Sequence, residues 1–83
     1  MEMEYFEDGG HLYEFCVLSP VEGDDYDVEC FDRSADGPGL VGTLFVDPVG
    51  VGRLVLEAEV PVRVLHRWLG YAEAAAGLAS SDG

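Results

Sequence analysis

The chain alternates acidic and apolar side chains over residues 24–32, Asp-Asp-Tyr-Asp-Val-Glu-Cys-Phe-Asp. A period of two is typical of a β-strand that has one face on a core and the other in water. The strand predicted here, over about residues 25–33, turns Asp25, Asp27 and Glu29 to the same side. Neighbouring carboxylates on that side lie roughly 6.6 Å apart, because a strand rises about 3.3 Å per residue. The stretch therefore predicts both a strand and a regular row of negative charge.

Three further strands and one helix are predicted around this strand. Runs of apolar residues between Gly- and Pro-rich loops mark the strands, and an amphipathic stripe that begins after a proline marks the helix. The predicted elements are a flexible acidic arm over 1–10, strands over 11–18, 40–47 and 53–60, a helix over 61–79 and a polar tail over 80–83.

The sequence predicts an α+β fold in a single domain of residues 1–83. A four-stranded antiparallel β-meander over 11–60 is followed by one C-terminal α-helix packed on one sheet face, in the order β-β-β-β-α. If the first hairpin turns near Gly23, Cys16 lies opposite Cys30 and Phe15 opposite Phe31. The predicted core face is then made of Leu12, Cys16, Leu18, Tyr26, Val28, Cys30, Leu44, Val46, Leu54, Leu56 and Ala58, against Leu65, Trp68, Leu69 and Ala72 of the helix.

This register leaves an apolar second face without a helix. Its predicted interface residues are Tyr13, Phe15, Phe31 and Phe45. Monomers rarely expose so large an apolar patch. Three alternatives remain for what covers this face: a second copy packed sheet to sheet as a homodimer, a partner protein, or the N-terminal arm with Tyr5 and Phe6.

The charge of the chain is strongly negative and unevenly distributed. The net charge is −13 over 83 residues. Residues 1–36 hold twelve acids and one arginine, which gives −11, and residues 37–83 hold five acids and three arginines, which gives −2. Such polarisation favours an acidic face directed at a basic partner, and it disfavours direct binding to nucleic acid, whose phosphates it would repel.

Catalytic chemistry is poorly supported by the sequence. His11 and His66 are the two histidines, and both are expected at the surface, with His11 near Asp32 or Arg33. Cys16 and Cys30 are expected to be reduced, buried thiols. No serine stands in a nucleophile elbow. The expected protein is not an enzyme.

Cofactor, metal and membrane sites are likewise not expected. The acids of residues 24–29 lack the glycine and the bidentate glutamate of a calcium loop, and Gly50-Val51-Gly52 lacks the lysine of a phosphate loop. The acidic N-terminus does not resemble a signal peptide, and no apolar run reaches the roughly 18 residues of a membrane helix. The expected compartment is the cytoplasm, which for a phage protein is that of the host cell.

The leading functional hypothesis is a small non-enzymatic inhibitor that binds the basic nucleic-acid-binding surface of a target protein. In size, acidity and lack of catalytic motifs the chain resembles small phage-borne inhibitors, including the acidic anti-CRISPR proteins that mimic DNA; anti-restriction proteins are a related type. The alternatives are an immunity or antitoxin protein that masks a toxin's basic active site, and a structural protein that works by oligomerising. The predicted partner-binding residues are Glu22, Asp24, Asp25, Asp27, Glu29, Asp32 and Asp36.

Overall fold

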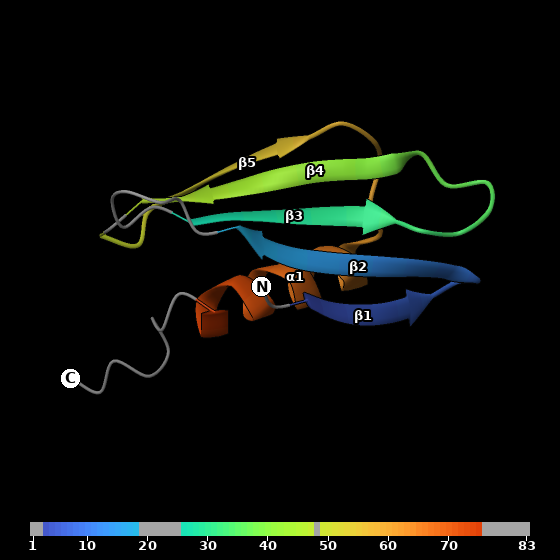
Figure 1. The fold of residues 1–83 in the computed structure, drawn as a ribbon, viewed down its shortest axis with the longest axis horizontal. Helices are drawn as coiled ribbons and strands as arrows, with labels where there is room; N and C mark the ends of the chain where they lie inside the picture. The colour runs from blue at the N-terminus through green and yellow to red at the C-terminus, as the bar shows by residue number, and fades with distance from the viewer. Residues whose placement is uncertain (1–2, 19–25, 48, 76–83) are drawn as a thin grey trace.

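The computed structural model describes residues 3–18, 26–47 and 49–75, which form one antiparallel sheet of five strands and one helix (Figure 1). The strands lie side by side in chain order, so the sheet is a meander. This confirms the α+β fold with an antiparallel sheet and a C-terminal helix, with five strands in place of four. The elements are β1 (Met3–Asp8), β2 (His11–Leu18), β3 (Tyr26–Asp32), β4 (Gly39–Val46), β5 (Gly52–Leu56) and α1 (Val62–Ala75).

The additional strand, β1, comes from the segment that was predicted to be a flexible arm. It pairs with β2 from Met3 opposite Cys16 to Asp8 opposite His11. Gly9 and Gly10 form the turn with φ of 60° and 83°. A two-residue hairpin with positive φ at both turn positions matches the right-handed twist of the strands, and glycine adopts it without steric cost. The arm therefore extends the sheet at its edge and does not fold over its open face.

The predicted phase of β2 is wrong by one residue. Phe15 lies opposite Cys30, and Cys16 lies opposite Glu29. A slip of one residue turns every side chain of a strand to the other face. Phe15 and Tyr13 are consequently buried in the core beneath α1, whereas Leu12 and Leu18 lie on the face without a helix.

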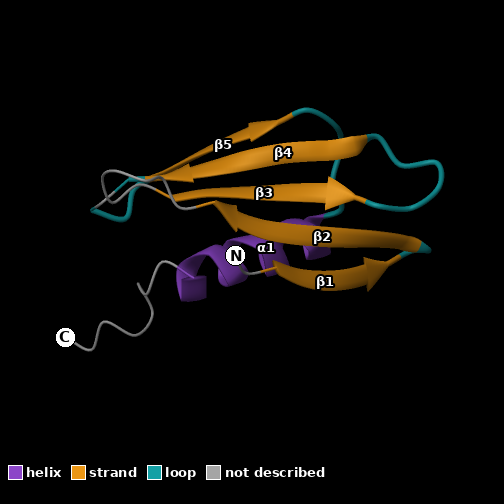
Figure 2. Cartoon of the chain, in the orientation of Figure 1, coloured by secondary structure: helices purple, strands orange, loops and turns teal. Residues whose placement is uncertain are grey.

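The core lies between the sheet and α1, which covers β1 and β2 from behind in the view of Figure 2. Trp68 and Val64 of α1 are fully buried, and the ring of Phe15 lies 5.8 Å from that of Tyr71. Leu69, which was predicted to face the core, is 42% exposed. The buried stripe of the helix is thus centred on Val64 and Trp68.

Two ion pairs fasten β1 to α1. Arg63 Nε lies 3.1 Å from Asp8 Oδ1, and Arg67 Nε lies 3.5 Å from Glu4 Oε2. The guanidinium of Arg67 also stacks 4.9 Å from the ring centroid of Phe6. Two basic residues of the helix are therefore engaged by acids of the N-terminal strand.

Candidate functional site: the open face of the sheet

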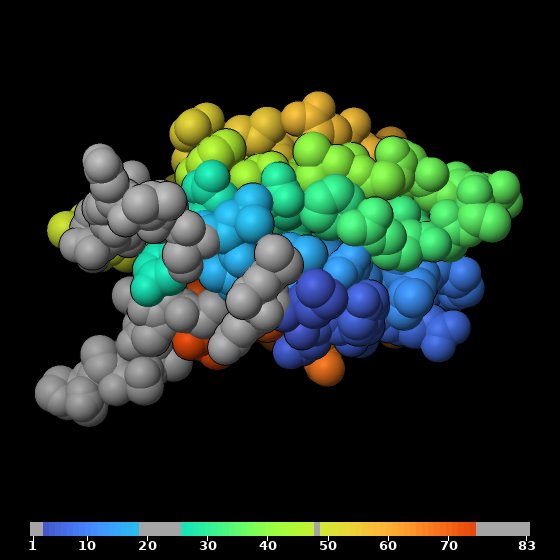
Figure 3. All heavy atoms as spheres, in the orientation of Figure 1, coloured from blue at the N-terminus to red at the C-terminus, as the bar shows by residue number. Residues whose placement is uncertain are grey.

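The sheet face opposite α1, called the open face below, faces the viewer in Figure 3. Its members follow from the strand registers, because side chains alternate between the two faces. Side chains that lie opposite one another across the strands form rows on this face. One row runs from Leu18 through Asp27 and Phe45 to Arg53, and the next runs from Met3 through Cys16, Glu29 and Thr43 to Val55.

Two of the predicted partner-binding acids lie at the centre of the open face. Asp27 and Glu29 are consecutive residues on this side of β3, and both are partly exposed. Among the described residues, neither makes an ion pair or a side-chain hydrogen bond. Their carboxylates remain available to a ligand in solution.

The remaining predicted acids are distributed differently. Asp36 is exposed in the loop between β3 and β4. Glu22, Asp24 and Asp25 lie outside the described residues. The structure therefore brings together Asp27 and Glu29 of the predicted set.

Asp32 does not belong to the open face. Its side chain is 6% exposed and lies on the helix side of β3. It accepts hydrogen bonds from the backbone N–H and the hydroxyl of Ser34, at 3.0 and 2.6 Å. Burial acts to raise the pKa of Asp32, but the hydrogen bonds from Ser34 and the proximity of His11 outweigh it, so the pKa lies below its ordinary value. Asp32 holds the start of the β3–β4 loop.

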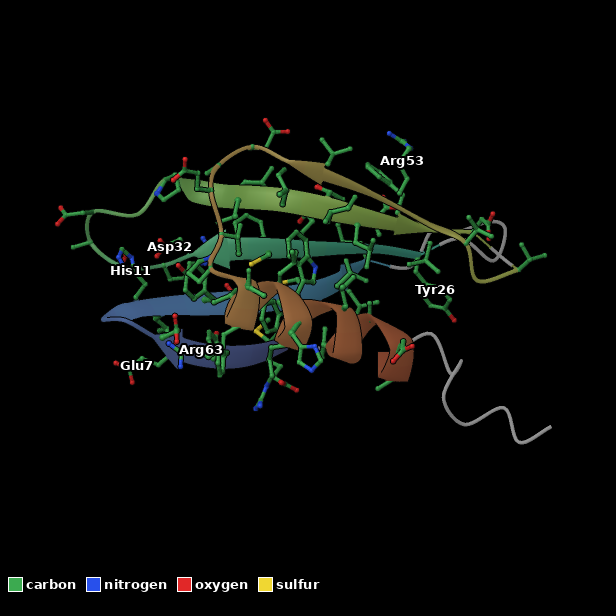
Figure 4. The ribbon with its side chains drawn as sticks, turned by 180° about the vertical axis from the view of Figure 1, so that it is seen from behind. Glu7, His11, Tyr26, Asp32, Arg53 and Arg63 are labelled. Carbon is green, nitrogen blue, oxygen red and sulfur yellow. The ribbon has the colours of Figure 1, made fainter. Side chains whose placement is uncertain are left out.

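His11, Asp32 and Ser34 gather the residue types of a hydrolase triad at one end of the sheet, where Figure 4 shows His11 beside Asp32. The geometry is different. Asp32 Oδ2 and Ser34 Oγ both lie 3.0 Å from the same ring atom, His11 Nδ1, and the Ser34 hydroxyl donates to Asp32. A triad needs the serine at Nε2, so that the ring can take its proton. The cluster fits a structural role.

The open face contains an ion pair that the sequence pattern did not reveal. Arg33 Nε lies 2.6 Å from Glu14 Oε1, and the hydroxyl of Tyr5 donates to Glu14 Oε2 at 3.3 Å. Glu14 is 7% exposed in its side chain, and the hydrogen bond from Arg33 lowers its pKa. These three residues come from three segments of the chain, so only the registers could have shown that they meet.

Several acids of the strongly acidic residues 1–36 form ion pairs within the fold. Glu4, Asp8, Glu14 and Asp32 all belong to the acidic first 36 residues, and each has a cationic or histidine partner. The net charge of −11 is therefore not displayed on one face. On the open face, Asp27 and Glu29 form an adjacent pair of acids without an ion pair to a described residue, and Glu7 and Glu57 are exposed acids farther out on the same face.

The aromatic residues predicted to form an interface divide between the two faces. Tyr13 and Phe15 are 4% and 0% exposed, respectively, and belong to the core, which corrects their assignment. Phe31 and Phe45 lie on the open face. Arg33 stacks 4.2 Å from the centroid of Phe31, and Arg53 stacks 4.6 Å from that of Phe45. A cation therefore covers each of these rings.

Two exposed apolar side chains share the rows of the open face that contain Asp27 and Glu29. Leu18, opposite Asp27, is 38% exposed, and Met3, in the row of Glu29, is 45% exposed. We define Asp27, Glu29, Leu18 and Met3 as the acidic patch. It combines fixed negative charge with apolar area on a hydrogen-bonded sheet.

The cysteines and the acids offer little for metal or redox chemistry. Both thiols are free and buried, as predicted, and burial raises the pKa of Cys30 to about 12. Over residues 3–18, 26–47 and 49–75, no cluster of three or more His, Cys, Asp or Glu could hold a metal ion. Among these residues, no helix combines the length and apolar character needed to cross a membrane.

Comparison with known proteins found no match to a protein-family model, a curated protein or a solved structure. The open face itself is therefore the basis for inferring the function.

Proposed function

We propose that this protein is a non-enzymatic inhibitor that binds the basic, nucleic-acid-binding surface of a target protein through the acidic patch. One observation carries the proposal. Asp27 and Glu29 stand next to each other on the open face without an ion pair to any described residue, while Glu4, Asp8, Glu14 and Asp32 are all engaged within the fold.

The spacing of the two carboxylates suits a groove built to hold phosphates. They are about 6.6 Å apart along β3, and one strand of duplex DNA carries a phosphate per about 3.4 Å of axis, with a larger separation along its own path. A basic groove that accepts a phosphate row would thus meet charges of similar sign and spacing. β3 lies in the middle of the sheet, so the pair is held on a rigid support.

The exposed apolar side chains of the acidic patch can contribute affinity that its charges alone would not. Interfacial charges mainly accelerate association and select the partner, whereas buried apolar contacts contribute more of the affinity. Leu18, directly opposite Asp27, and Met3, two strands away from Glu29 in the same row, are exposed and can be buried by the partner. Arg33 and Arg53 neighbour the patch, but both are stacked on aromatic rings, and Arg33 is neutralised by Glu14.

The test is affinity capture from a nuclease-treated bacterial lysate with three forms of the chain. These are the wild type, the patch variant Asp27→Lys/Glu29→Lys and the matched control Glu59→Lys/Glu73→Lys, which has the same net charge and alters exposed acids elsewhere. We expect the wild type and the control to capture a nucleic-acid-binding protein that salt or duplex DNA releases. We expect the patch variant to lose it.

Other outcomes of this capture experiment would contradict the proposal or favour a different function. Equal capture by the patch variant would contradict the proposal, as would a partner that neither salt nor DNA displaces. A toxin enzyme captured through the same patch would favour the immunity-protein alternative.

A further inference from the structure

The outer strand β5 ends the sheet with unpaired backbone groups. The hydrogen bonds at its two ends, from Asp47 N to Val51 O and from Glu57 N to Val41 O, fix which residues point toward β4. Because this orientation alternates along a strand, odd-numbered residues from 51 to 57 bond to β4 and even-numbered residues point outward. The outward groups, which no described residue accepts or donates to, belong to Gly52, Leu54 and Leu56.

The two edges of the sheet differ in how they are protected. β1, at the other edge, carries Glu4, Glu7 and Asp8, and charged side chains discourage pairing with another strand. The sequence of β5 is Gly-Arg-Leu-Val-Leu, with one charge and no proline. Leu56 is 46% exposed. The β5 edge thus has the properties of a pairing surface.

Three antiparallel registers form at least two pairs among the outward residues Gly52, Leu54 and Leu56 of two β5 strands. They place Arg53 opposite Arg53, Val55 or Glu57 of the second copy. The first opposes like charges directly, which is destabilising. The third pairs Arg53 with Glu57 twice, sets Val55 against Val55 on the two-fold axis and pairs Leu54 with Leu56. This register is complementary to itself in both charge and apolar character.

Arg53 and Glu57 each lack an ionic partner among the described residues, and the other contact of the Arg53 guanidinium is its stacking on the ring of Phe45. Both side chains belong to exposed residues on the open face of the sheet. Within one copy they are roughly 13 Å apart along the strand, since each residue rises about 3.3 Å. They meet only across an interface.

We propose that the protein forms a two-fold homodimer in which β5 of each copy pairs with β5 of the other, in the register that sets Arg53 opposite Glu57. The ten strands then form one continuous sheet with both open faces on the same side. The two β3 strands are five strand spacings apart, about 24 Å, so each dimer presents two acidic patches. This interface does not use Asp27 or Glu29, and it can hold whether or not the proposed function does.

Sedimentation equilibrium and amide hydrogen exchange over a concentration series test the dimer together. We expect a species of twice 9.0 kDa, with the amides of Leu54 and Leu56 protected only where the dimer forms. The amides of Arg53 and Val55 bond to β4 and should be protected in monomer and dimer alike. A persistent monomer would overturn the proposal, and so would a dimer in which Leu54 and Leu56 exchange as unprotected amides.

Charge exchange tests the register. Arg53→Glu or Glu57→Arg alone opposes like charges at both pairs and should weaken the dimer roughly tenfold. The double variant Arg53→Glu/Glu57→Arg restores opposite charges and should recover it, while Glu59→Arg should have no such effect. Failure of the double variant to recover the dimer would overturn this register.

A proline variant separates the edge from the fold. Leu56→Pro removes an outward N–H and leaves the bonds to β4 intact, so it should abolish the dimer while the tryptophan fluorescence of the folded monomer is kept. A folded Leu56→Pro variant that still dimerises would contradict pairing through β5.

Discussion

The indole N–H of Trp68 donates a hydrogen bond to the backbone oxygen of Val28, 3.1 Å away inside the core. This bond joins the only tryptophan of the chain, on α1, to the central strand that carries Asp27 and Glu29. The helix thereby fixes β3 from behind, while the acidic patch faces away from it. The helix thus contacts one face of β3, and Asp27 and Glu29 lie on the other face of the same strand.

Truncating Trp68 should destabilise the fold strongly. Trp68→Phe loses the hydrogen bond and some packing, and we expect the free energy of unfolding to fall by about 1–3 kcal/mol; Trp68→Ala should cost about 3–5 kcal/mol. The exposed neighbour His66 is the control, because His66→Ala should change stability by less than about 0.5 kcal/mol. Urea denaturation followed by circular dichroism measures these differences. Equal effects at the two positions would be inconsistent with a core centred on Trp68.

Gly42 allows β5 and the helix to approach β4 closely. A Cβ at this position would lie 2.5 Å from the carbonyl oxygen of Val55 and 3.1 Å from Cη2 of Trp68. We expect Gly42→Ala to destabilise the protein by about 1–3 kcal/mol. A Cβ added at Gly70, in α1, would have nothing within 4 Å, and Gly70→Ala should stabilise the protein by about 0.5–1 kcal/mol. A thermal melt of both variants shows whether the signs are opposite, as expected.

Acid should destabilise the protein partly through Asp32. Its pKa is ordinarily 3.8 and is lowered in the fold, so the unfolded chain binds more protons in this range and stability rises with pH. The contribution is complete above the unfolded pKa and is lost as the pH falls through the lowered folded value. Asp32→Asn should flatten this part of the stability profile, and the exposed Asp36→Asn should not. Urea denaturation across a pH series would contradict the assignment if both profiles kept the wild-type slope.

The two thiols should not form a disulfide within one chain. Cys16 lies opposite Glu29 on the open face, and Cys30 lies opposite Phe15 on the helix face, so their side chains project from opposite sides of the sheet. After mild oxidation of the folded monomer, mass spectrometry should detect no loss of two hydrogens. Native alkylation should also leave Cys30 unmodified, because it is fully buried and its pKa is about 12. Formation of the intrachain disulfide without unfolding would show that the register of β2 and β3 is different.

The sequence located four of the five strands, although the strand predicted over 53–60 is observed at Gly52–Leu56, and it did not determine the face that each strand presents. β2 was predicted over its observed residues, because its apolar run is bounded by clear turns. Its phase was not, since Leu12, Tyr13, Phe15, Cys16, Val17 and Leu18 make it apolar on both sides. Alternation sets the register only where one face is polar. β3 has that alternation, and its orientation was predicted correctly.

The missed strand had a local signal of its own. Gly9-Gly10 between two segments with aromatic residues is a hairpin signature, but the acidic composition of residues 1–8 favoured an arm. In the fold, Arg63 and Arg67 of α1 form ion pairs with acids of this segment. These arginines lie far from the segment in sequence, so its local residue pattern does not reveal the pairing.

The candidate site was predicted in part for the same reason. Asp27 and Glu29 follow from the alternation of β3, whereas the burial of Asp32 depends on where His11 and Ser34 lie around it. Total charge identified an acidic protein, and only the ion pairs showed which acids of the described residues have a partner within the fold and which do not.

Competition with DNA for the captured target is the sharpest test of the proposed function. A labelled duplex bound to that target is titrated with the wild type, with Asp27→Lys/Glu29→Lys and with Glu59→Lys/Glu73→Lys, while fluorescence anisotropy reports the fraction of DNA bound. We expect the wild type and the Glu59/Glu73 variant to displace the DNA, more strongly at low salt, and the Asp27/Glu29 variant to leave it bound. Displacement of the duplex by the Asp27/Glu29 variant at the wild-type concentration would refute binding through the acidic patch.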